Sequence, residues 1–169
     1  MFDVGQVVVY SATGVCEIEK IEEKSFGSFS SKYYILKPLM QKAATIFVPT
    51  ENSALTEKIH NILTKQDFEE IFKTVAKRKP VRPETEAERR EGFSEVISKG
   101  DRENLILIVY DLRLMQKEQV EGGRRLHIAD ERLMNSAENL LSEEIAYVYG
   151  IPKEEALDFV KQKIAENMK

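Results

Sequence analysis

Several side chains on which protein chemistry commonly depends are scarce in this chain of 169 residues, which contains no tryptophan, one cysteine and two histidines. Because Cys16 is alone, no intramolecular disulfide can form, and a secreted scaffold stabilised by disulfides is excluded. A long apolar run is also missing, since the most apolar stretch covers only residues 105–110, whereas a bilayer span needs roughly 20 residues. The opening MFDVGQ lacks the basic and apolar regions of a signal peptide, so we expect a cytoplasmic protein in a reducing compartment, with no membrane segment.

Patterns that would support catalysis or metal binding are absent as well. His60 and His127 lie in separate predicted segments without the spacing of metal ligands, and the chain contains no P-loop, GxSxG, HExxH or GxGxxG sequence. Cys16 lies in a predicted strand with no adjacent base, which favours a core residue over a nucleophile. We interpret adjacent carboxylates such as Glu143 and Glu144 as solvated surface residues. The sequence therefore predicts no enzyme, no cofactor, no metal site and no small-molecule substrate, with an enzyme of unrecognised type as the weakest alternative.

The first 49 residues predict a small β module. VVVY at residues 7–10 is apolar on both faces, and residues 15–21 alternate, with Cys16, Ile18 and Ile21 on the buried side after one irregular step. Further strands are predicted at residues 33–36 and 45–48, whereas KIHNIL at residues 58–63 fits either a last strand or a linker. Short strands at this density resemble a Tudor or SH3-like barrel, which binds partners through a groove or an edge strand.

The rest of the chain predicts a bundle of about five helices, so the fold class is α+β. Thr64 and Asp67 have the spacing of a capping box at the start of the first helix, which should end in a basic linker near residues 77–83. Residues 84–99 and 102–121 predict the next two helices. A fourth begins near residue 129 and ends at Gly150, and Pro152 opens a fifth.

The charge distribution points to the middle of the chain for any contact with nucleic acid. Residues 71–125 carry 13 basic and 10 acidic side chains, a net charge of +3, whereas the whole chain carries −4. Acidic residues interrupt the basic clusters, which favours weak, assisted contact with DNA over tight independent binding. The alternative interpretation of this segment is a solvated helix surface without a partner.

In order and spacing, several sequence blocks resemble the CarD/CdnL family of bacterial RNA polymerase-binding transcription regulators. The blocks are MFDVGQVVVY, GVCEIEKIEE, KYYILKP, TIFVPTEN and DERLMNSAENLLSEEIAYVYGIPKEE. The resemblance implies a Tudor-like domain that binds the β subunit of RNA polymerase, as in transcription-repair coupling factors. It also implies a helical domain that contacts promoter DNA and stabilises the open complex. Tethering to polymerase would let modest basic contacts suffice.

The resemblance implies that the polymerase contact falls on Lys24, Ile46 and Phe47, although Phe47 occupies a position that is arginine in some members. The candidate DNA contacts come instead from the basic clusters of the linker and the helices: Lys79, Arg82, Arg89, Arg90 and Arg125. Of these, Arg89 matches a basic position of the family. The family's tryptophan, which wedges into the edge of the transcription bubble, is missing, and Arg82 or Glu86 takes its place depending on the alignment of the linker.

These observations predict two domains and leave the function of the second one open. Residues 1–58 form the expected Tudor-like domain that interacts with RNA polymerase, and residues 59–169 the helical domain close to DNA. The leading hypothesis is a transcription regulator that binds polymerase β and promoter DNA and modulates the stability of the open complex. The alternative hypothesis is an adaptor on RNA polymerase without significant DNA activity.

Overall fold

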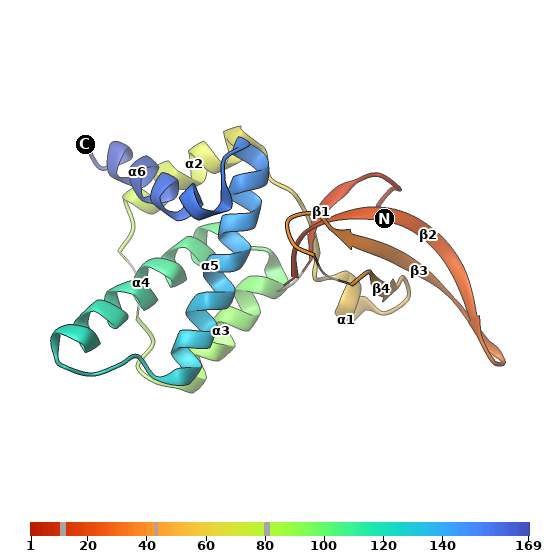
Figure 1. Ribbon diagram of the computed structural model, residues 1–169, viewed down its shortest axis with the longest axis horizontal. Helices are drawn as coiled ribbons and strands as arrows, with labels where there is room; N and C mark the ends of the chain where they lie inside the picture. The colour runs from red at the N-terminus through yellow and green to blue at the C-terminus, as the bar shows by residue number, and fades with distance from the viewer. Residues whose placement is uncertain (11–12, 43, 80–81) are drawn as a thin grey trace. The chain divides into compact units, whose positions relative to one another are not determined.

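The computed structural model describes residues 1–10, 13–42, 44–79 and 82–169, apart from the side chain of residue 26. Residues 80 and 81 of the predicted basic linker therefore lie outside the described residues. Two compact units make up the chain, Met1–Ile62 and Leu63–Lys169. The first is a β unit and the second a helical unit, in agreement with the predicted α+β class (Figure 1).

The described residues of the β unit form one antiparallel sheet of five strands in the order β4-β3-β2-β1-β5. Its strands are β1 (Val7–Tyr10), β2 (Gly14–Phe26), β3 (Phe29–Pro38), β4 (Ile46–Pro49) and β5 (Ile59–Asn61), and the short helix α1 (Ser53–Thr56) lies between the last two. Residues 58–63, for which a last strand and a linker were both considered, contain a strand, because β5 pairs with β1. The first unit consequently ends at Ile62, four residues beyond the expected boundary.

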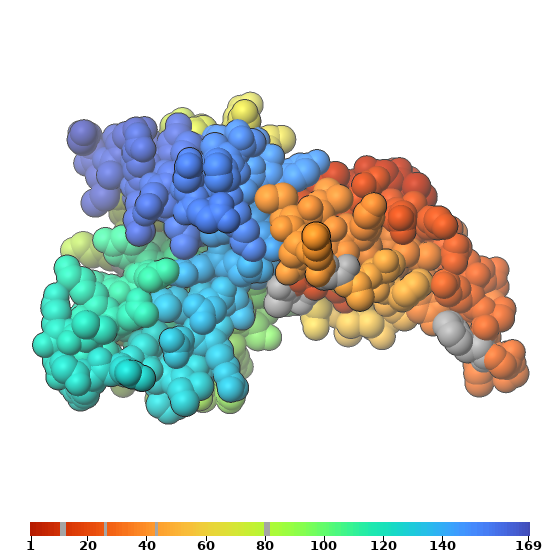
Figure 2. Space-filling model, in the orientation of Figure 1, coloured from red at the N-terminus to blue at the C-terminus, as the bar shows by residue number. Residues whose placement is uncertain are grey.

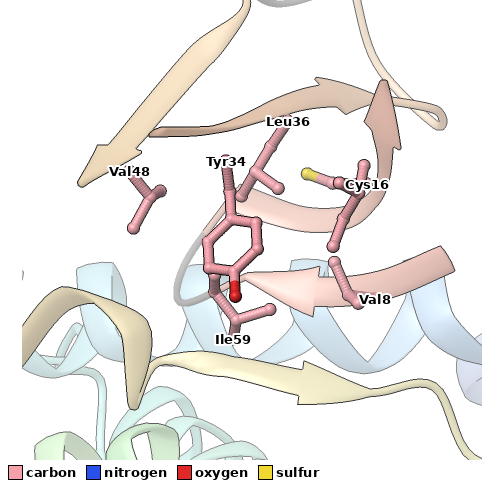
Figure 3. Close-up of a cluster of buried hydrophobic side chains, with 7 residues drawn as sticks. Val8, Cys16, Tyr34, Leu36, Val48 and Ile59 are labelled. Atoms are coloured by element: carbon pink, nitrogen blue, oxygen red, sulfur yellow. The ribbon is translucent and has the colours of Figure 1, made fainter. Parts of the chain in front are cut away.

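Alternation along the strands builds the core of the β unit. Figure 3 shows side chains converging from β1, β2, β3, β4 and β5, among them Val8, Cys16, Leu36 and Val48, each of which is completely buried. The irregular step predicted in β2 is present, because the pairing with β3 shifts between Ile18 and Lys20. This bulge keeps both Ile18 and Ile21 on the core side.

The helical unit contains five α-helices and one 3-10 turn among the described residues. They are α2 (Lys65–Ala76), α3 (Glu86–Lys99), α4 (Arg102–Glu121), α5 (Ile128–Tyr149), the 3-10 turn η2 (Lys153–Glu155) and α6 (Ala156–Asn167). The predicted capping box is confirmed, since Thr64 and Asp67 exchange hydrogen bonds at the start of α2. Pro152 precedes η2, so a 3-10 turn comes before the last α-helix instead of the helix starting directly at that proline.

Two adjacent carboxylates are buried in α5, and their prediction as solvated surface residues was wrong. Glu143 accepts a hydrogen bond from Lys153 at 3.0 Å, and Glu144 forms two hydrogen bonds with buried Arg102, at 2.8 and 3.1 Å. The backbone N–H of Leu63 also donates to Glu144 at 3.1 Å. Burial is tolerated because each carboxylate has cationic and hydrogen-bonding partners, which an adjacent acidic pair in a sequence does not reveal.

Candidate functional site

The surface of the β unit opposite its core carries two of the three predicted polymerase-binding residues, Lys24 of β2 and Phe47 of β4. Cross-strand partners point to the same face of a sheet, and Phe47 pairs with Ile35, which in turn pairs with Lys20. Lys24 lies an even number of residues beyond Lys20 and therefore belongs to the same face. Leu36 and Val48, one step along their strands, point to the opposite, buried face.

Lys24 and Phe47 meet on this face. The Lys24 ammonium nitrogen lies 4.4 Å from the centroid of the Phe47 ring, within the range of a cation–π interaction, and 3.4 Å from a carboxylate oxygen of Glu22. Phe47 is nevertheless 45% exposed, which is unusual for a large apolar side chain on a sheet. We call this pair, Lys24 and Phe47, the β-face patch. Contacts with Lys24 hold an exposed aromatic ring in a defined position.

The third predicted polymerase contact is placed differently. Ile46 is half-buried and packs against the core of the β unit, so its side chain does not join the β-face patch. Its strand, β4, is an edge of the sheet and pairs only with β3 in the described part of the chain. One side of its backbone can therefore accept an added strand from a partner.

Two of the predicted DNA-binding arginines form ion pairs inside the helical unit. Arg89 of α3 binds Asp130 of α5 through two hydrogen bonds of 2.7 Å, and Asp130 is only 2% exposed. Arg82 contacts two acidic residues of α4, Asp111 at 2.8 Å and Glu118 at 2.7 Å. Hydrogen bonds with these carboxylates raise the pKa of Arg89 and of Arg82. Arg82 therefore links the segment before α3 to α4, and Arg89 links α3 itself to α5.

The other three predicted DNA-binding residues, Lys79, Arg90 and Arg125, are exposed. Within the described residues, none of the three has an ion-pair partner. The start of α3 meets the start of α5, because His127 Nδ1 lies 3.2 Å from a carboxylate oxygen of Glu86. Arg90 lies one turn after Glu86 and Arg125 two residues before His127, so both belong to the segments that meet at this junction. We call Arg90 and Arg125 the junction arginines.

Sequence reasoning missed which arginines are neutralised by acidic partners. Each partner of Arg82 and Arg89 lies at least 29 residues away in the chain, so no local spacing could reveal it. The only available signal was the acidic residues within otherwise apolar helices, of which Asp111 is an example. An acidic residue on an apolar helix face is buried only with a cationic partner.

No group of three histidine, cysteine or carboxylate side chains in the described ranges is placed to hold a metal ion. Cys16 is completely buried in the β core. No helix in the described part of the chain is long and apolar enough to cross a membrane.

Comparison with known families matches both units. The family model of the CarD-like/TRCF RID domain matches residues 2–62, and that of the CarD C-terminal domain matches residues 70–161. The chain belongs to the CarD-like family. Members of this family are non-enzymatic transcription regulators that carry an RNA polymerase interaction domain.

A curated relative aligns with this chain over nearly the full length of both proteins. The protein named "Putative transcription factor YdeB" from Bacillus subtilis (strain 168) is 25% identical over 161 residues, which cover 94% of this chain and 99% of the relative. The predicted resemblance to CarD is thereby confirmed for both halves of the chain, and the RNA polymerase interaction domain coincides with the β unit.

Proposed function

We propose that this CarD-like protein binds the β subunit of RNA polymerase through its β unit and contacts promoter DNA with its helical unit, thereby modulating the stability of the open promoter complex. The observation that carries the proposal is the presence, in one chain and in this order, of the RNA polymerase interaction domain and the CarD C-terminal domain. In this proposal the first domain attaches the protein to RNA polymerase, and the second domain acts on the promoter complex that the polymerase forms.

The β-face patch supports the choice of the polymerase-binding surface. An exposed aromatic ring held by a neighbouring cation loses little conformational entropy on binding, and aromatic residues dominate the binding energy of many interfaces. The patch lies on strands β2 and β4, and the free edge of β4 adds backbone groups for strand pairing. We propose Lys24 and Phe47 as side-chain contacts, with Ile46 positioning the edge strand from the core side.

Direct binding to the β1 lobe, which is a part of the polymerase β subunit and is unrelated to strand β1 of this protein, tests the attachment. The full chain should bind the isolated lobe at micromolar concentration, and Phe47→Ala should weaken binding at least about tenfold, equivalent to 1.4 kcal/mol. Phe29→Ala is a matched control, because Phe29 is an even more exposed phenylalanine at the end of the β2–β3 hairpin. No association of the folded protein with the lobe at micromolar concentration would refute the proposal.

We propose the DNA contact for the basic side chains that form no ion pair with a carboxylate of the helical unit in the described residues. Among the predicted residues these are Lys79 and the junction arginines, whereas Arg82 and Arg89 hold acidic partners. A few exposed cations give weak, salt-dependent binding on their own, which tethering to polymerase makes sufficient. In this proposal Arg82 and Arg89 act on DNA binding only by fixing α3.

An adaptor without DNA activity is the second candidate function. The observation that favours it is the engagement of Arg82 and Arg89 in ion pairs, together with the absence of tryptophan. The two functions differ in one observable, the lifetime of the open promoter complex, which an adaptor leaves unchanged while still binding polymerase.

A further inference from the structure

A groove with a volume of about 380 Å³ runs along the helical unit between α4 and α6. Its floor comes from α5, through Leu141 and Glu138, and its two walls are the facing sides of α4 and α6. Figure 2 shows these two helices on the same face of the helical unit, α6 in dark blue and the C-terminal half of α4 in green-blue. The groove lining includes neither the β-face patch nor the junction arginines.

The two walls have the same helical spacing. The groove is lined at positions 106, 109, 110, 113, 114 and 117 of α4, and at positions 157, 160, 161, 164, 165 and 168 along α6 and its end. Each set advances by alternating steps of three and one and therefore follows a single face of its helix over three turns, about 16 Å. Two helical faces that line one groove over this length, with a floor from α5, form the kind of surface that binds an amphipathic helix.

Three of the six large apolar side chains that are exposed in the described part of the helical unit line this groove. Tyr110, Leu114 and Met168 are 55%, 42% and 69% exposed, and all three line the groove. Below them, Ile106 and Val160 are buried at its base. Single exposed apolar residues are common on protein surfaces, but a continuous set along a groove is typical of a binding site.

Among the side chains that line the groove, three are basic and one is acidic, so the lining carries a net positive charge. Lys117 lies on the α4 wall and Lys161 on the α6 wall, and both are exposed. Arg113, also on the α4 wall, is held by a two-point ion pair with Glu138 on the floor, which cancels the negative charge there. The partners of the two lysines are weak: Glu121 lies 3.9 Å from Lys117 and exposed Asp158 lies 3.3 Å from Lys161.

We infer that the α4–α6 groove binds an amphipathic α-helix of a partner protein, with an apolar face toward the groove and acidic residues along its flanks. The apolar lining selects the apolar face, and lysines on both walls select acidic flanks on both sides of the bound helix. The charge of the occupant follows from Lys117 and Lys161, since a helix with basic flanks would meet repulsion from both walls.

The test uses the full chain and two synthetic helices of about four turns with the same leucine face, one flanked by glutamate and one by lysine. In NMR titrations the acidic helix should shift the signals of residues 106–117 and 157–168. The lysine-flanked helix should bind about tenfold more weakly, because two favourable charge contacts become repulsive. Leu114→Gln should weaken the acidic helix about tenfold, whereas Val120→Gln, at a more exposed site on α4 outside the groove, should not.

Several results would overturn the inference. These are equal affinity for the two helices, no signal shifts at millimolar peptide, shifts confined to other residues, or equal losses for Leu114→Gln and Val120→Gln. Concentration-dependent dimerisation through the groove in the absence of peptide would assign it instead to a second copy of this chain. Because no polymerase or DNA takes part, failure here leaves the proposed function standing.

Discussion

At the scale of single residues, the predicted DNA-binding arginines fall into two groups according to what their guanidinium groups contact. Arg82 and Arg89 bind carboxylates of α4 and α5, whereas Arg90 and Arg125 are exposed without an ion-pair partner in the described residues. Arg89 and Arg90 are neighbours in the chain and yet have opposite environments. Net charge along a sequence therefore locates a basic segment but does not identify the cations available to phosphate.

Replacing Arg89 tests this division through stability. Arg89→Ala should lower the free energy of unfolding by about 3 kcal/mol, because it leaves buried Asp130 without its partner. Arg90→Ala, the adjacent exposed arginine, should change it by less than about 0.5 kcal/mol. Urea denaturation of the two variants measures both values, and similar values for the two would show that the Asp130 pair contributes no special stability.

The contact between Lys24 and Phe47 can be measured by a double-mutant cycle for polymerase binding. If the ammonium group orients the ring, replacing both residues by alanine should cost about 0.5–1 kcal/mol less in binding free energy than the sum of the single replacements. Titration calorimetry with the β1 lobe provides the four affinities. Strict additivity would mean that the two side chains contribute independently.

At the scale of secondary-structure elements, local signals predicted most of the fold. The capping box at Thr64, the bulge after Ile18 and the C-terminal stop at Gly150 each depend on residues close in sequence, and all three are present. Strand β5 could not be assigned from its three residues, because its pairing with β1 joins segments about 50 residues apart. The buried carboxylates of α5 were missed for the same reason, since Arg102 lies 42 residues from Glu144.

For the candidate binding surfaces, the sequence indicated the strands and helices that carry them but not how their side chains come together. The meeting of Lys24 with Phe47 depends on a contact across β3, which lies between their two strands in the sheet. The α4–α6 groove depends on how two helices pack on α5, which no spacing within one helix determines. Periodicity identifies an apolar helix face but does not show whether another element covers it.

The capping box of α2 predicts a pH dependence. Hydrogen bonds from the Thr64 side chain and backbone lower the pKa of the Asp67 carboxyl group, so the folded state binds a proton less readily than the unfolded state. The resulting stabilisation is present above the ordinary pKa of aspartate and is lost as the pH falls through the lowered value. Asp67→Asn should therefore destabilise the protein at neutral pH, and its difference from the wild type should shrink on acidification. Urea unfolding at several pH values tests this, and a difference that grows in acid would contradict it.

At the scale of the whole molecule, two units with separate cores match two family domains. The first unit ends after β5, whose residue Ile59 is buried, so a fragment cut at residue 58 would lose both a core side chain and a strand pairing. A fragment of residues 1–62 should unfold cooperatively and bind the β1 lobe within about threefold of the full chain. A fragment of residues 1–58 should be less stable by about 2–4 kcal/mol. Thermal unfolding compares the two fragments, and equal stability would show that β5 is dispensable.

The proposed function assigns attachment to polymerase and action on DNA to different units. Phe47→Ala should reduce occupancy of the polymerase, so that its effect on the promoter complex is restored at higher protein concentration. Replacing both junction arginines should leave occupancy intact and remove the effect itself. The matched control replaces Lys73 and Lys99, two exposed cations that pair with Glu70 and Glu95 on their own helices, by alanine.

The lifetime of open promoter complexes, measured at saturating protein with and without the double variant Arg90→Ala/Arg125→Ala, tests the proposed function most directly. The wild-type protein should change the lifetime clearly, the arginine variant should leave it near the value without protein while still binding the β1 lobe, and the lysine control should behave as the wild type. A lifetime that the wild-type protein does not alter, or that it alters equally without the two arginines, would contradict the proposed DNA contact.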